Sequence, residues 1–186
     1  RKEAKDAIQA LHACGISKVV MMTGDSRRTA EAVAREVGVD QFYAEVLPED
    51  KANFVRQEKA AGRKVIMIGD GVNDTPALSE ADVGIAINTG AAIAREIADV
   101  TIASEDLFEL VTLRKISQAL MGRIQRNYRF IVGFNLMLIV LGVTGVIQPT
   151  TSALLHNAST LGISLDSMTD LLDKDKEKAL PETESA

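Results

Sequence analysis

Gly69-Asp70-Gly71-Val72-Asn73-Asp74-Thr75-Pro76-Ala77-Leu78 directly follows the apolar run Val65-Ile66-Met67-Ile68. A continuous apolar run of this kind predicts a buried strand, and the glycines after it predict a turn at the strand's carboxyl end. Asp70 and Asp74 place two carboxylates on that turn, and hard oxygen ligands suit Mg²⁺. Because glycine lets backbone N–H groups approach an anion, the same turn is also typical of a phosphate site.

Short apolar strands and helical patterns alternate through the first hundred residues. The expected strands cover residues 19–22, 65–68, 83–87 and 100–103, and the expected helices cover 26–37, 48–62, 75–81 and a segment starting at 91. This alternation predicts an α/β fold with a doubly wound parallel sheet. Ligands bind beyond the carboxyl ends of the strands in such sheets, where the sequence places both 23–25 and 69–71.

The other expected site residues supply charge and hydrogen-bond donors for a phosphate. Thr23 offers a hydroxyl and Gly24 an unhindered N–H at the end of one strand, and Lys51 offers a point charge after Leu47-Pro48-Glu49-Asp50. Taken singly, each motif is an ordinary turn or helix start. Together they are the electrostatic parts of phosphoryl transfer, namely a metal, a cation and fixed donors.

A long uncharged stretch separates the second half of the chain from the first. Residues 130–165 contain no Asp, Glu, Lys or Arg. After an expected helix over 107–129, the apolar segment 130–147 is long enough to cross a bilayer, and Pro149 interrupts it. Residues 152–168 are long enough to return, although they are more polar. We therefore predict a cytoplasmic stalk helix followed by an α-helical transmembrane hairpin over 130–168. A hydrophobic hairpin buried in a soluble core is the alternative.

Basic residues flank the predicted hairpin but are absent from its loop, which places both flanks in the cytoplasm. They are Arg114, Lys115, Arg123, Arg126 and Arg129 on one side and Lys174, Lys176 and Lys178 on the other. The prediction is an integral membrane protein, in the plasma membrane, with its α/β domain (1–106) and charged tail (169–186) in the cytoplasm. The row Arg123, Arg126 and Arg129 is interpreted as a membrane-interface anchor and, secondarily, as a lipid head-group site.

Polar side chains within the predicted spans are candidates for binding a transported ion. Asn135 lies in the first span, and His156 and Thr160 share one face of the second span, with Asn157 beside them. Imidazole suits Zn²⁺, Co²⁺ or Ni²⁺, and oxygen-rich surroundings suit Mn²⁺. The alternative is that the amide and hydroxyl groups only join helices through hydrogen bonds and that His156 lies near the outer interface.

Composition narrows the remaining possibilities. A chain of 186 residues is one domain or one domain with an appendage. Its 21 basic and 26 acidic residues give a net charge of −5, so no nucleic-acid partner is expected. Cys14, the single cysteine, excludes an internal disulfide and a metal site made of cysteines alone.

Three motifs resemble the phosphorylation domain of P-type ATPases, which belong to the haloacid-dehalogenase superfamily. They are Met22-Thr23-Gly24-Asp25, Leu47-Pro48-Glu49-Asp50-Lys51 and the segment 69–78 quoted above. The hairpin after a stalk helix resembles the C-terminal part of the heavy-metal (type IB) branch, so that about residues 1–172 are covered. The resemblance implies ATP-driven export of a transition-metal cation through an aspartyl-phosphate intermediate, with ATP bound by a domain that this chain lacks.

The same resemblance implies roles for individual residues. Asp70 would ligate Mg²⁺ and Asp74 would support that site, while Lys51 would neutralise the phosphoryl group. Contacts to that group are implied for Thr23, Gly24 and Asn73, and a role in closing the site is implied for Asp25. Thr75 stands where the family often has Ala, which leaves the metal site untouched.

One motif of the family is missing from this sequence. The nucleophilic Asp of Asp-Lys-Thr-Gly-Thr has no counterpart, because the Asp-Lys pairs here are at 50–51, 173–174 and 175–176. Without a nucleophile no covalent intermediate forms, so the chain alone is predicted to be inactive. The alternative is a non-catalytic membrane-tethered module, either a truncated product or a fragment that depends on a partner. A soluble phosphatase is excluded, since it needs an Asp-x-Asp strand and has no membrane spans.

Overall fold

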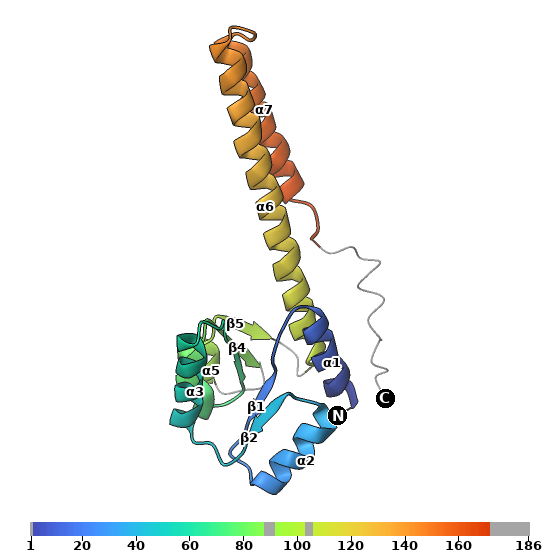
Figure 1. Cartoon of the computed structure of the whole chain (residues 1–186), viewed down its shortest axis with the longest axis vertical. Coiled ribbons are helices and arrows are strands. Elements are labelled where there is room, and N and C mark those ends of the chain that lie inside the picture. The colour runs from blue at the N-terminus through green and yellow to red at the C-terminus, as the bar shows by residue number, and fades with distance from the viewer. Residues whose placement is uncertain (1, 88–91, 103–105, 172–186) are drawn as a thin grey trace. The chain divides into compact units, whose positions relative to one another are not determined.

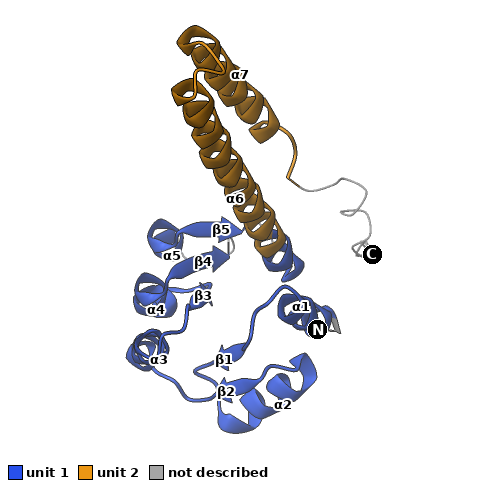
Figure 2. Cartoon of the chain, turned by 45° about the horizontal axis from the view of Figure 1, so that its top comes forward, with its two compact units in different colours: residues 1–112 blue, residues 113–186 orange. Residues whose placement is uncertain are grey.

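The computed structural model describes residues 2–87, 92–102 and 106–171, and these residues form two compact units. Unit 1 comprises residues 1–112 and unit 2 residues 113–186 (Figure 2). The predicted tail over 169–186 lies almost wholly outside the described residues.

Unit 1 alternates helices and strands (Figure 1), and the expected elements occur in the expected order, with a helix over 2–13 and a strand over 41–43 in addition. Its elements are α1 (Lys2–Ala13), β1 (Val20–Met22), α2 (Arg27–Val37), β2 (Gln41–Tyr43), α3 (Pro48–Ala60), β3 (Ile66–Gly69), the 3₁₀ turn η1 (Val72–Asp74), α4 (Thr75–Glu80), β4 (Val83–Ile87), α5 (Ala92–Ile97) and β5 (Val100–Ile102).

Local chemistry sets the helix boundaries in unit 1. Ser26 caps α2 by accepting a hydrogen bond from the Thr29 N–H, and Gly38 ends the helix with a φ of 80°. Pro48 begins α3, where its missing N–H costs nothing. Strand β2 was not predicted, because Gln41-Phe42-Tyr43 contains a polar residue and lacks the continuous apolar run that marks the other strands.

All strand pairs are parallel, as predicted, but the described strands form two sheets and not one. β1 pairs with β2, and β3, β4 and β5 form a second sheet in that order. The core nevertheless joins the two sheets. Met22, at the end of β1, packs against a buried cluster that includes Val55 of α3 and Met67 of β3. The residue after Met22 is Thr23, so this packing brings the end of β1 to the same core as β3.

The start of β3 is fixed by a carboxylate. Asp82 accepts hydrogen bonds from the Val65 N–H and from Lys64 Nζ, each at 3.0 Å. The backbone hydrogen bond is the larger cause, and together with Lys64 it lowers the pKa of Asp82 below its ordinary value of 3.8. This contact ties β3 to the loop that precedes β4.

Unit 2 is a pair of helices. The expected stalk and first span form one continuous helix, α6 (Phe108–Val143), which begins at the end of unit 1 and stops four residues before the predicted end of the span. Gly145, with a φ of 74°, helps to turn the chain, and Pro149 starts α7 (Pro149–Ser167) instead of only breaking the run.

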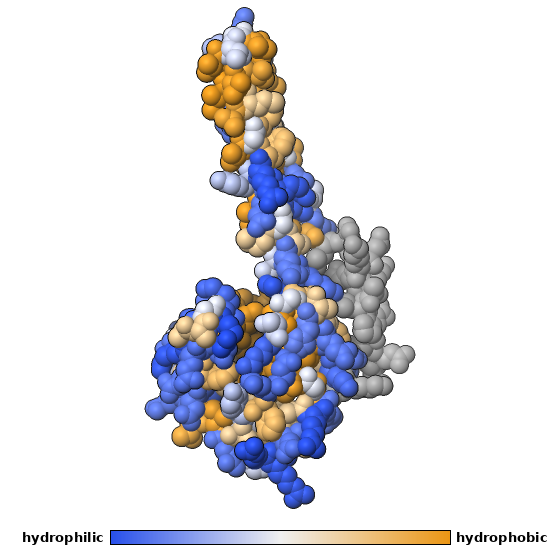
Figure 3. All heavy atoms as spheres, in the orientation of Figure 1, coloured by the Kyte–Doolittle hydropathy of each residue, from blue (hydrophilic) through white to orange (hydrophobic). Residues whose placement is uncertain are grey.

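The exposure of α6 disfavours the soluble-core alternative for the described residues. α6 is long and apolar enough to cross a membrane, and only 6% of its most apolar window is buried. Among the described residues α7 does not meet the same test of length and composition. Figure 3 shows apolar side chains covering the half of the hairpin near the α6–α7 loop. A surface of this kind requires lipid or further helices to cover it.

A candidate phosphate site and a polar contact between the helices

Lys51 and Asp74 form the centre of the candidate phosphate site. Lys51, in the first turns of α3, donates a hydrogen bond from Nζ to Asp74 Oδ1 at 2.7 Å. Both side chains are nearly buried, at 13% and 11% exposed. The second oxygen of Asp74 accepts the backbone N–H of Asp70 at 3.3 Å. Asp74 therefore fixes the position of the Lys51 ammonium relative to the turn after β3.

Gly69 is required by the position of Asp74. A Cβ atom on residue 69 would lie 2.5 Å from Asp74 Cβ and 2.9 Å from its Cγ, which is closer than such atoms approach one another. The glycine thus lets the Asp74 side chain lie directly against the end of β3. The sequence analysis assigned this glycine to a turn and missed this steric role.

The side chains of Asp70 and Asn73 are exposed beside this pair. Neither makes a side-chain hydrogen bond or ion pair within residues 2–87, 92–102 and 106–171. The carboxylate of Asp70 is therefore available to an incoming cation, whereas both oxygens of Asp74 are already engaged by Lys51 and a backbone N–H. Of the two predicted metal ligands, Asp70 is the one whose oxygens are free.

The turn at the end of β1 is held by its own hydrogen bonds and by the segment after β2. Thr23 Oγ1 donates to Asp25 Oδ2 at 2.9 Å and accepts the Asp25 N–H at 3.1 Å. The N–H groups of Glu45 and Val46 donate to the carbonyl oxygens of Asp25 and Thr23. Glu45 adopts a φ of 57° in this segment. This support was not predicted, because Glu45 and Val46 lie in the segment that follows the unpredicted β2.

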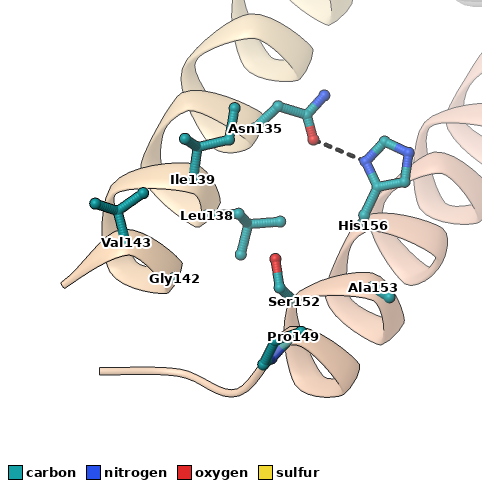
Figure 4. Close-up of a pocket in the computed structure, with 9 residues that line it drawn as sticks. All are labelled: Asn135, Leu138, Ile139, Gly142, Val143, Pro149, Ser152, Ala153 and His156. Carbon is teal, nitrogen blue, oxygen red and sulfur yellow. Dashed lines mark hydrogen bonds between the residues drawn. The ribbon is translucent and has the colours of Figure 1, made fainter. Parts of the chain in front are cut away.

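In unit 2 the structure brings together two of the four predicted ion-binding residues. His156 Nδ1 and Asn135 Oδ1 are 2.8 Å apart across the two helices (Figure 4). They line a groove of about 620 Å³ between α6 and α7, together with Ser152 and apolar residues. Among the residues that the structure describes, no three His, Cys, Asp or Glu side chains gather as a metal cluster.

The other two predicted residues do not line this groove. Thr160 donates from Oγ1 to the carbonyl oxygen of His156 at 3.0 Å, so its hydroxyl is satisfied within α7. Asn157 is exposed and makes no side-chain hydrogen bond within the described part of the chain.

Known proteins resemble this chain both in unit 1 and over most of its length. The haloacid dehalogenase-like hydrolase family matches residues 1–82. The manganese-exporting P-type ATPase of Mycobacterium leprae is 41% identical over 168 residues, which are 90% of this chain and 23% of the relative. Copper-transporting ATPase 2 of Rhizobium meliloti is 46% identical over 155 residues, covering 83% of this chain and 18% of the relative.

A solved structure extends the similarity to both units. The crystal structure of a zinc-transporting PIB-type ATPase in the E2.Pi state superposes with a TM-score of 0.83 at 33% identity. The match covers 89% of this chain and 27% of that one. Over most of its length the chain is therefore similar to heavy-metal P-type ATPases. Like the two curated relatives, the zinc transporter is much longer than this chain, which spans about a fifth to a quarter of their length.

Proposed function

We propose that this chain is part of an ATP-driven transition-metal exporter and supplies the phosphate-binding half of its phosphorylation site. The Lys51–Asp74 pair carries the proposal, because it brings a nearly buried lysine of α3 to the turn after β3. The same turn bears the unengaged carboxylate of Asp70, so a cation and a metal ligand are combined there. Phosphoryl transfer depends on such fixed charges more than on covalent chemistry by the protein.

The residues present fit a Mg²⁺ ion. Mg²⁺ binds in such sites through one or two carboxylates, with phosphate oxygens and water completing its octahedron. Asp70 provides a carboxylate without a partner in the described structure, and Asp74 holds the Asp70 backbone in place. When bound, the metal would offset the negative charge of the phosphoryl oxygens. Asp74 acts on this site through Lys51 and the backbone of residue 70.

The remaining residues bind and orient the phosphoryl group. Lys51 places its ammonium at the mouth of the β3 turn, and Asn73 presents an exposed amide from the same turn. The hydroxyl of Thr23 and the N–H of Gly24 lie at the end of β1, whose last residue packs on the core that contains Met67 of β3. Asp25 holds the Thr23 hydroxyl and thereby orients this second group of donors.

The chain is expected to be inactive alone. Its sequence contains no Asp-Lys-Thr-Gly-Thr segment. The described strands form two sheets, and this division leaves β1 and β3 each with one unpaired edge. We propose that a strand bearing the nucleophilic aspartate joins these edges and completes the site. The alternative, a non-catalytic module, would not require a strand that bears a nucleophilic aspartate.

Transport is proposed to use the hairpin. Asn135 and His156 are the groups that we assign to the ion pathway, because they are polar, face one another and line a groove in an otherwise apolar helix pair. The relatives are named for manganese, copper and zinc, so a transition-metal cation is the proposed cargo. We propose a plasma-membrane protein, and the flanking basic residues favour an orientation with unit 1 in the cytoplasm.

A chimera tests the proposal. Residues 1–168 of this chain would replace the matching segment of the M. leprae manganese exporter, and metal-stimulated ATP hydrolysis and phosphoenzyme would be measured. We expect both activities to be retained, and Asp70→Ala or Lys51→Ala to reduce them at least 100-fold, about the loss of one strong electrostatic contact. Glu49→Gln, an exposed carboxylate in the same helix turn as Lys51, is the matched control. A chimera that folds and stays active with Asp70→Ala would refute the assignment.

A further inference from the structure

The cytoplasmic end of the hairpin holds a cluster of contacts that the proposed function does not use. Arg123 donates from one guanidinium nitrogen to the carbonyl oxygens of Thr169 at 2.7 Å and Ser167 at 3.4 Å, and from the other to that of Asp170 at 2.8 Å. Arg126 pairs with Asp166 at 2.9 Å, and Asn127 donates to the Ser167 hydroxyl at 3.3 Å. These contacts, all between the α6 side chains and residues 166–170, are here called the arginine clamp.

The arginine clamp supplies what the end of α7 lacks. The last carbonyl groups of a helix have no partner within it, and the partial negative charge there favours a cation. α7 has no basic residue in its last turn and carries Asp166 there, which the same charge disfavours. Arg123 and Arg126 of α6 place positive charge at this end of α7, where Arg126 pairs with Asp166 and Arg123 donates to the Ser167 carbonyl oxygen.

This observation changes the interpretation of the arginine row. The sequence predicted that Arg123, Arg126 and Arg129 anchor the chain at the membrane interface. In the structure Arg126 donates to Asp166 of α7, and Arg123 donates mainly to carbonyl oxygens of residues that directly follow α7. Only Arg129 of the three makes no hydrogen bond or ion pair within the described residues, which leaves it as the one suited to lipid head groups.

The distance between the arginine clamp and the Asn135–His156 contact is similar along α6 and along α7, which run antiparallel. Asn135 lies nine positions after Arg126 on α6, and Asp166 lies ten positions after His156 on α7. At 1.5 Å per residue these are about 13.5 and 15 Å. A slip of one helix by a turn, about 5.4 Å, would therefore break both contacts at once.

We propose that Arg123 and Arg126 are positioning residues that fix α7 at one register on α6 and thereby hold His156 against Asn135. Asn135 Oδ1 accepts a hydrogen bond from Nδ1–H of His156 in this register, which leaves Nε2 unprotonated. The arginine clamp thus selects the tautomer of a histidine about 15 Å away. The inference goes beyond the proposed function, because it holds whether or not the hairpin conducts an ion.

The test uses the full 186-residue chain in phosphatidylcholine nanodiscs. Nitrogen NMR of ¹⁵N-labelled histidine, at a pH well above the ordinary histidine pKa of about 6.5, reports which ring nitrogen carries the proton. His156→Gln assigns the signals. We expect the Nδ1–H form in the wild type and in Arg129→Gln. In Arg123→Gln/Arg126→Gln we expect the ratio of Nδ1–H to Nε2–H to fall about fivefold, as for loss of one hydrogen bond.

A charge exchange separates positioning from a general loss of structure. Arg126→Asp should lower the ratio, and adding Asp166→Arg should restore it to within about twofold, because the ion pair is rebuilt in reverse. Circular dichroism checks that each variant stays helical. An unchanged tautomer ratio in the helical Arg123→Gln/Arg126→Gln variant would overturn the inference, as would failure of the exchanged pair to restore it. If the double variant loses its helices, the tautomer ratios of Arg126→Asp and of Arg126→Asp/Asp166→Arg provide the test instead.

Discussion

Replacing Lys51 with Met removes the ammonium but keeps most of the side-chain volume, and it leaves the Asp74 carboxylate without its cation. Breaking a fully buried ion pair costs about 3–5 kcal/mol, whereas an exposed pair contributes about 0–1 kcal/mol. The Lys51–Asp74 pair is 13% and 11% exposed, so it lies near the buried limit. Because Asp74 keeps the hydrogen bond from the Asp70 N–H, we expect Lys51→Met to cost about 2–3 kcal/mol in local stability.

Hydrogen exchange of the whole chain measures this cost at the turn after β3. A loss of 2–3 kcal/mol corresponds to about 30- to 150-fold faster exchange for amides of residues 66–80 that open together. Asp74→Asn in the Lys51→Met background removes the unpaired charge, so the double variant should exchange more slowly than Lys51→Met. Lys64→Met, which breaks a pair whose lysine is 88% exposed, is the control and should change exchange much less.

The reasoning fails if the two substitutions are additive. A double variant whose loss equals the sum of the single losses would show that Lys51 and Asp74 do not interact, despite the 2.7 Å contact. An unchanged exchange rate in Lys51→Met would show that Asp74 is solvated rather than dependent on its cation.

Three further predictions test other parts of the structure. Gly69→Ala should destabilise unit 1 by about 1–3 kcal/mol, seen in hydrogen exchange, because its Cβ would overlap Asp74, whereas Gly122→Ala, with nothing within 4 Å, should not destabilise the chain. Asp82→Asn should make the stability of unit 1 less dependent on acid pH. The pKa of Asp82 is lowered in the folded chain, so its stabilisation is complete above about pH 4 and is lost as the pH falls through the folded pKa. In an acid titration followed by circular dichroism, the variant should therefore lose less signal than the wild type over that range. Titration calorimetry of the chain should show only weak Mg²⁺ binding that Asp70→Ala abolishes, since one free carboxylate without a phosphate gives few ligands; tight binding would contradict the assignment.

Sequence patterns predicted unit 1 well where the residues themselves set the local structure. Ser26, Gly38 and Pro48 define helix ends through caps and fixed φ angles, and the structure places those ends within one or two residues of the prediction. Strand β2 was not predicted because Gln41-Phe42-Tyr43 is not a continuous apolar run. The support that Glu45 and Val46, just after β2, give to the Thr23 turn was therefore not predicted either. In the hairpin, a long apolar run predicted a helix but could not show that the stalk and the span are one helix.

The candidate phosphate site was also predicted only in part. The order of the motifs indicated that Asp70, Asp74 and Lys51 belong to one site, since ligands lie at the carboxyl ends of parallel strands. Which carboxylate stays free was not predictable, because that depends on which oxygen the Lys51 ammonium reaches. The arginine row shows the reverse case, where a regular spacing suggested lipid contacts and the structure pairs two of its members with α7.

By itself the amino-acid sequence determined the α/β alternation, the apolar hairpin and the residue types at the phosphate site, because these follow from local periodicity, turn chemistry and charge. Only the tertiary structure decided that the strands form two sheets and that Asp74 binds Lys51 while Asp70 remains available. It also decided that Arg123 and Arg126 contact residues 166–170 at the end of α7. These contacts join residues 23 to 47 positions apart. Their geometry depends on how whole elements pack, which no local pattern records.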